Sequence, residues 1–106
     1  MEDKKDGKTA AILSYIIIIG PLVALSINSE NKNSFASFHI RQGLGITIIF
    51  ISLGLIISNF NNSMILISMW IFISVLSMYG MLTAAKGETK SLPIIGNFLQ
   101  KIFKNI

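Results

Sequence analysis

Hydrophobic positions along the chain fall into two long runs that no charged residue interrupts. The first run, Thr9–Ser29, has 21 residues, and the second, Gln42–Ala85, has 44. A bilayer core about 30 Å thick needs roughly 20 apolar residues per spanning helix, so the first run predicts one span and the second predicts two. The polar segment 59–63, Asn-Phe-Asn-Asn-Ser, divides the second run, and asparagine favours a turn between two helices.

The pattern predicts an all-α fold, an integral membrane bundle of three transmembrane helices plus a C-terminal amphipathic interfacial helix. The single membrane domain, 1–106, comprises a polar tail (1–8), a first span (9–27), a second helix with an interfacial start (34–58), a third span (64–85) and an amphipathic helix (93–104). The last helix is too short to span, but it has an apolar side and a lysine-bearing side that suit a membrane interface.

Gly20 and Pro21 lie in the middle of the first predicted span. Proline removes a backbone donor and clashes with the carbonyl four residues earlier, so a kinked span is the preferred interpretation. The alternative is a re-entrant hairpin, or two half-helices around an unwound site. A cleaved signal peptide is disfavoured because the apolar stretch is long and the segment 27–30 is a poor cleavage site.

Composition agrees with a membrane protein. Charged residues make up 13% of the chain and hydrophobic residues 52%, whereas soluble domains carry about 25% charged residues. With one histidine, no cysteine and five acids, the chain offers neither an activated nucleophile nor a set of metal ligands. We therefore predict no enzymatic activity, no cofactor, no metal and no nucleic-acid partner. The absence of charge within the spans also argues against a proton relay or a voltage sensor.

The basic residues give an orientation. With three spans, one face carries Lys32, Arg41, Lys86, Lys90, Lys101 and Lys104, and the other carries Lys4, Lys5 and Lys8. The positive-inside rule then predicts a multi-pass protein of the bacterial inner membrane with a cytoplasmic C-terminus and an external N-terminus. A re-entrant first segment would instead place all nine basic residues on one side.

Polar and aromatic residues near the predicted cytoplasmic face form a candidate interaction motif. Its members are Phe35, Phe38, His39, Arg41, Gln42, Lys86, Glu88 and Pro93. Anchoring at the interface and pairing between helices is the preferred interpretation, and a ligand or proton-handling role is the alternative. We expect a cross-helix contact between Arg41 or His39 and Glu88.

Small residues follow one strip on each of the two later helices. They are Gly43, Thr47, Gly54 and Ser58 on the second helix and Ser77, Gly80 and Ala84 on the third. Such strips let helix backbones approach closely in lipid. We expect them to pack the second and third spans together, with docking to another membrane protein as the alternative.

Four blocks of sequence carry a resemblance. They are Gly7-Lys8-Thr9, the segment 35–45 (FASFHIRQGLG), Lys86-Gly87-Glu88, and Pro93 with Gly96 and the segment 98–103 (FLQKIF). The chain resembles the Tic-twenty-like family, small bacterial membrane proteins of unknown function related to a channel-type subunit of the chloroplast protein import machinery. The resemblance implies an integral bundle of three or four helices and a link to protein translocation, although the plant proteins have four spans.

The leading hypothesis is a non-enzymatic accessory or scaffold subunit of a membrane complex, linked to protein translocation or secretion. Its expected partners are the lipid bilayer and another integral membrane protein or a homo-oligomer. The alternative is a small oligomeric channel or transporter for neutral or small ionic solutes, built around Gly20 and Pro21. A third hypothesis is a lipid-interacting protein that uses the basic tail helix.

Overall fold

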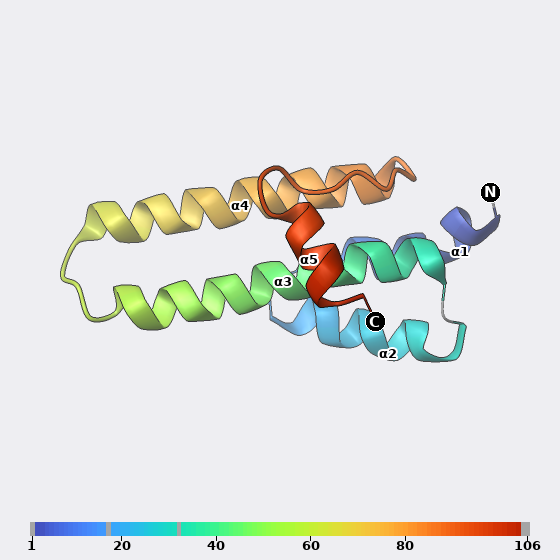
Figure 1. Cartoon of the computed structure of the whole chain (residues 1–106), viewed down its shortest axis with the longest axis horizontal. Coiled ribbons are helices and arrows are strands. Elements are labelled where there is room, and N and C mark those ends of the chain that lie inside the picture. The colour runs from blue at the N-terminus through green and yellow to red at the C-terminus, as the bar shows by residue number, and fades with distance from the viewer. Residues whose placement is uncertain (1, 17, 32, 105–106) are drawn as a thin grey trace.

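Five helices make up the described part of the computed structural model, residues 2–16, 18–31 and 33–104, and this part contains no strand. In chain order they are α1 (Glu2–Leu13), α2 (Ile19–Asn31), α3 (Ser34–Ile57), α4 (Ser63–Ala85) and α5 (Gly96–Ile102). α3 and α4 form a long antiparallel hairpin, and the other three helices gather on the half of it away from the α3–α4 connection (Figure 1). The predicted all-helical class is confirmed.

Two helices, not three, could span a membrane. Among the described residues only α3 and α4 are both long and apolar enough to do so. The predicted first span, 9–27, is not one helix, because α1 ends at Leu13, α2 begins at Ile19 and the chain turns back between them (Figure 1). α1 and α2 thus form a re-entrant hairpin that packs on α3. Gly7 of α1 lies against the side chain of Asn33, which follows α2, so the chain returns at the end of the hairpin to the level at which α1 begins.

The reversal precedes Gly20 and Pro21, and the expected kink at these residues is therefore wrong. Pro21 is the third residue of α2. Backbone N–H groups in the first turn of a helix have no intrahelical acceptor, so proline is tolerated there and marks the beginning of a helix. The turn itself contains Ile18 with φ of 77°, a left-handed conformation that is costly for a β-branched residue.

The corner between α2 and α3 is held by side-chain amides. The Asn28 side chain accepts from the Asn33 backbone N–H at 2.8 Å and donates to the Ser37 hydroxyl at 3.0 Å. The Asn33 side chain accepts from the backbone N–H of Ala36 at 3.0 Å and caps α3. These bonds satisfy polar groups at a buried corner and fix the direction in which α3 starts.

The buried residues of α3 are confined to one half of the long hairpin. Every buried residue of α3 lies between Phe35 and Thr47, the stretch that faces α1, α2 and α5 as well as α4. Beyond Thr47 only α4 accompanies α3, and large side chains such as Leu55 are exposed. At the far end α3 stops at Ile57, and the Asn62 side chain caps α4 by accepting from a backbone N–H.

The tail helix is shorter than predicted and lies on α3. α5 has seven residues, Gly96–Ile102, where the pattern predicted 93–104. Its Leu99 is buried against Gly45 of α3, whereas Phe98 and Ile102 are exposed. The apolar side of the predicted helix is therefore divided, with one part in the core and another part on the outer surface.

Candidate functional site

The end of α4 delivers a backbone carbonyl to the interior. Gly87 has φ of 76°, which glycine adopts readily. Its N–H bonds to the carbonyl of Ala84 at 3.1 Å, and the N–H of Glu88 bonds to that of Thr83 at 2.9 Å. This pair of bonds is a Schellman motif, which ends the helix and turns the chain back. The carbonyl of Glu88 then lies 2.7 Å from Nε2 of His39 on α3.

The tip of the re-entrant hairpin binds α3 through two buried hydroxyls. The Ser14 hydroxyl donates to the carbonyl oxygens of Ala11 at 2.6 Å and of His39 at 3.0 Å. The Tyr15 hydroxyl lies 2.6 Å from Nδ1 of His39. Ser14 and His39 are fully buried and Tyr15 is almost so. The turn therefore makes inside the protein the polar contacts that lipid would deny it.

Gln42, one turn further along α3, completes the network. Its Nε2 donates to the Tyr15 hydroxyl at 2.7 Å, and its Oε1 accepts from the backbone N–H of Leu92 at 2.8 Å. Leu92 lies in the segment that returns from α4 toward α5. One fully buried side chain thus joins three segments that are far apart in sequence.

The hydrogen-bond network indicates which ring nitrogen of His39 carries the proton. Because the carbonyl of Glu88 can only accept, Nε2 of His39 carries a proton and donates to it. In the neutral ring Nδ1 is then an acceptor, and it takes the proton of the Tyr15 hydroxyl, whose oxygen accepts from Gln42. His39 is neutral in this arrangement, and both of its ring nitrogens are satisfied.

Aromatic rings enclose His39. The ring centroids of Phe35, Phe38 and Tyr15 lie 4.9, 5.1 and 5.5 Å from that of His39, each in an edge-on arrangement. Such pairs add a modest stabilisation to the area that they bury. The histidine is therefore held as a core residue and is not open to a ligand.

Arg41 holds the tail helix. Its Nε donates to the carbonyl of Phe103 at 3.1 Å, and one terminal nitrogen donates to the Gln100 side chain at 3.1 Å. Gln100 in turn donates to the carbonyl of Phe38 at 2.9 Å. A cation at the last carbonyls of a helix satisfies unpaired acceptors and complements the helix dipole. Arg41 thereby ties α5 to α3.

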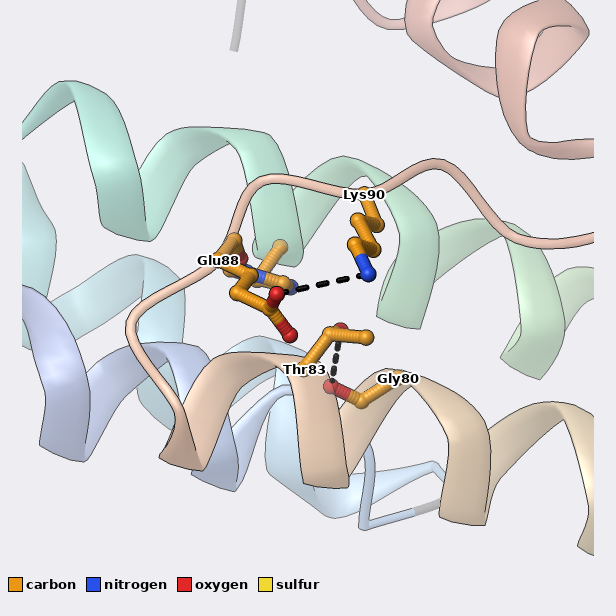
Figure 2. Close-up of polar contacts among 5 residues, drawn as sticks. Gly80, Thr83, Glu88 and Lys90 are labelled. Carbon is orange, nitrogen blue, oxygen red and sulfur yellow. Dashed lines mark hydrogen bonds and ion pairs between the residues drawn. The ribbon is translucent and has the colours of Figure 1, made fainter.

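The expected contact between His39 and Glu88 forms through the Glu88 backbone and not as a pair of charged side chains. The Glu88 carboxylate pairs with Lys90 at 3.3 Å on the same connecting segment, as Figure 2 shows, and His39 contacts Glu88 only through the backbone carbonyl. Both side chains of the ion pair are solvent-accessible, and exposed pairs contribute little to stability. Lys86 at the end of α4 and Pro93 before α5 are also exposed.

Three members of the small-residue strips contact the α1–α2 hairpin. Gly43 lies against the Ser14 backbone, Thr47 accepts from the N–H of Ile18 at 3.1 Å, and a Cβ on Gly80 would meet the ring of Tyr15. The expectation that these residues only pack α3 on α4 is therefore incomplete. Of the other members, Ala84 is buried, Ser58 is exposed, Gly54 has open space around its Cα, and the Ser77 hydroxyl, though buried, has no partner among the described residues.

Sequence reasoning missed the hairpin side of the site. Ser14 and Tyr15 form the only adjacent polar pair in the apolar stretch 10–25, six residues before Gly20. A pair of hydroxyls there is a signal for a buried turn, because each hydroxyl needs a partner in an apolar setting. Thr83, whose hydroxyl donates to the carbonyl of Gly80 at 2.9 Å, was also missed (Figure 2).

The site joins structural elements and has few groups suited to reaction chemistry. Its side chains are neutral or, for Arg41, bonded to backbone carbonyls. No group of three or more His, Cys, Asp or Glu residues that could hold a metal ion occurs within the described part of the chain. The arrangement can fix the depth and direction of the re-entrant hairpin and of the tail segment.

These features define a small helical, membrane-associated protein in which a buried polar network locks a re-entrant hairpin onto a pair of long helices. The chain belongs to the magnetosome magnetite crystal formation protein family (MamF/MmsF), whose model matches residues 6–99. Comparison with curated proteins and with solved structures gives no match.

The family match corrects two predictions. The resemblance to the Tic-twenty-like family is overturned, since the matching family model is a different one. The predicted role as an accessory subunit linked to protein translocation, and the alternative of a channel or transporter for small solutes, are also overturned, because the family is one of magnetite crystal formation. Membrane association, inferred from the uncharged runs, agrees with the family and with two helices of spanning length.

Proposed function

We propose that the chain is a non-enzymatic integral protein of the bacterial cytoplasmic membrane that serves magnetite crystal formation as part of the enclosing membrane. The observation that carries the proposal is the family match over residues 6–99, which includes α2, α3 and α4 completely. The matched region contains the whole polar network of Ser14, Tyr15, His39 and Gln42. The proposed role is therefore assigned to the locked bundle and not to a tail.

A role in the membrane is favoured over direct binding of iron or mineral. Hard metal ions are bound by clusters of carboxylates, alone or with imidazole. The sequence has five acids and one histidine, and that histidine is enclosed by aromatic rings and bonded through both nitrogens. The end at the α3–α4 connection, 58–62, has no charged residue at all.

The distribution of basic residues supports an orientation. In the re-entrant fold the start of α1, the α2–α3 corner, the end of α4 and the tail all lie on the half away from the α3–α4 connection (Figure 1). Eight of the nine basic residues lie in this half, and Lys32 lies outside the described residues. By the positive-inside rule both termini are cytoplasmic. The expectation of an external N-terminus depended on three spans and is dropped with them.

The proposed partner is the lipid bilayer, whose anionic headgroups suit the basic end. Exposed apolar side chains cover the half of the hairpin toward the connection, including Leu55, Met64 and Ile71. A second integral membrane protein, or a second copy of the chain, stays a prediction.

Genetic complementation tests the role. The chain is expressed in a magnetite-forming bacterium whose own family member has been deleted, and crystal dimensions are measured by electron microscopy. We expect crystal size to be restored toward the wild type by the chain and by Gly54→Leu, since Gly54 is open. Unchanged crystals in cells whose membranes contain the protein would contradict the proposal.

A further inference from the structure

The molecule is much wider at one end than at the other. Around the stretch of α3 from Phe35 to Thr47 lie α1, α2, α4 and α5, whereas beyond Thr47 only α4 accompanies α3 (Figure 1). Burial follows the same division, since no residue of α3 beyond Thr47 is buried. Along an overall length of 48 Å, the number of helices thus falls from five to two.

The re-entrant hairpin reaches a defined depth. Its deepest contact joins the N–H of Ile18 to the hydroxyl of Thr47. At 1.5 Å per residue, Thr47 lies about 20 Å along α3 from Ser34, and about 9 Å beyond Arg41, the last charged residue of that helix. The hydrocarbon core is about 30 Å thick. Counted from the other end, Thr47 lies about 15 Å before Ile57, where α3 ends, so in a core that ends at Ile57 the hairpin reaches the middle of the bilayer and stays within the nearer leaflet.

The surface of the hairpin suits lipid. Residues 9–29 carry no charge, and the outer face of α2 exposes Ile19 and Leu22, each at more than 60% of its surface. The polar groups of the turn bond to α3 as described, so no polar group of Ser14 or Tyr15 is presented to hydrocarbon. α5 adds exposed Phe98 and Ile102 beside Arg41, at the depth where amphipathic helices lie.

From these observations we infer that the chain is a wedge-shaped inclusion that favours bilayers curved outward on the side of its termini. The ligand is the lipid of that leaflet. A helix about 11 Å across occupies about 100 Å², so α1 and α2 together add about 200 Å² to one leaflet. A bilayer relieves such an area difference by making the expanded leaflet convex. The inference rests on the proposed integration in a membrane and not on a role in crystal formation.

Orientation in vesicles of different curvature tests the wedge. The chain has no cysteine, so Lys101→Cys is a unique reporter on the wide end and Asn61→Cys a unique reporter on the narrow end. Each full-length variant is reconstituted into small and into large vesicles of phosphatidylcholine and phosphatidylglycerol. A membrane-impermeant maleimide is then added before and after lysis with detergent, which gives the fraction of chains whose reporter faces outward.

In large vesicles we expect the two orientations to be equally populated. In small vesicles, whose outer leaflet is strongly convex, we expect Lys101→Cys to face outward over inward by a ratio of about three or more. Asn61→Cys should show the reciprocal bias. An outward fraction that does not depend on vesicle size would overturn the inference, whatever the outcome of the complementation experiment.

Two glycine variants test whether the hairpin is the source of the wedge. Gly43→Leu, added to the Lys101→Cys chain, places a side chain where the Ser14 backbone lies and should displace the hairpin tip, so the bias should disappear. Gly54→Leu adds the same side chain in open space and should keep the bias. Equal loss in both variants would contradict the inference. If Gly43→Leu does not reconstitute, the inference is tested by the outward fractions of the Lys101→Cys and Asn61→Cys chains in small and large vesicles.

Discussion

The two halves of the α3–α4 hairpin differ in the contacts that their side chains make. The half near the termini buries Ser14, Tyr15, His39 and Gln42, whose hydrogen bonds join three segments of the chain. The half near the connection exposes residues such as Leu55 and packs one helix on another. Polar groups inside a low-dielectric interior restrict the structure to arrangements in which each finds its partner. Lipid-facing apolar side chains impose no such restriction, so sensitivity to mutation should divide along the same line.

The largest difference is expected between two glycines of α3. Gly43→Ala puts a methyl group against the backbone carbonyl of Ser14, which cannot move without the hairpin, and we expect a loss of about 3 kcal/mol in the free energy of unfolding. Gly54→Ala meets no atom within 4 Å and should stabilise α3 by up to about 1 kcal/mol through helix propensity. Unfolding with a denaturing detergent, followed by circular dichroism, measures both. Equal changes in the free energy of unfolding of the two variants would contradict the proposed difference between the two halves.

A somewhat smaller loss is expected when the polar network is cut. Gln42→Leu leaves the buried N–H of Leu92 without its acceptor, which costs about 1–3 kcal/mol, whereas the Tyr15 hydroxyl loses the bond from Gln42 but keeps its bond to His39. Ser77→Ala is the control, because its buried hydroxyl has no partner within the described residues, and its removal should be neutral or stabilising. The same denaturation assay ranks the two variants. A Ser77→Ala loss as large as that of Gln42→Leu would contradict the network.

The hairpin tip offers a third test. Thr47→Val keeps the shape of the side chain but removes the acceptor of the Ile18 N–H, and we expect a loss of about 1–2 kcal/mol. Ile18→Gly should act in the opposite direction, because glycine adopts the positive φ of this residue without strain. Hydrogen exchange of the Ile18 amide reports the bond directly. Unaltered protection of that amide in Thr47→Val would exclude this hydrogen bond.

The smallest effect is expected at the tail. Arg41→Lys keeps the charge but loses the fork of donors that reaches Gln100 and Phe103, and should cost about 1 kcal/mol or less. The change should appear as faster exchange of amides in α5, with α3 and α4 unaffected. Exchange that rises throughout the bundle would show that Arg41 supports more than the tail.

Local signals in the sequence anticipated several helix ends. The asparagines of 59–62 indicated the connection between the long helices, because asparagine satisfies the backbone requirements of a turn. The charge gaps indicated apolar helices over α3 and α4. These features depend on a few neighbouring residues, which a sequence displays directly.

The re-entrant hairpin could not be recognised in the same way. A run of 21 uncharged residues is compatible with one membrane crossing or with a hairpin that returns. In both cases the backbone N–H and C=O groups are hydrogen-bonded within helices. The choice depends on Ser14 and Tyr15 finding His39 and Gln42, which lie 24 or more residues away. Pro21 was misleading because its effect depends on its position in a helix, and it occupies the first turn of α2.

The short connection between α3 and α4 has a consequence for how the protein enters a membrane. In the proposed orientation the start of α1 and the tail both lie on the cytoplasmic side, so only the connection 58–62, which has no charged residue, has to be carried to the far side. In that orientation the polar N-terminal segment and the basic C-terminal segment stay on the side on which they are made. Insertion therefore requires the transfer of a single uncharged helical hairpin, and the wide, hydrogen-bonded end can be assembled afterwards around its base.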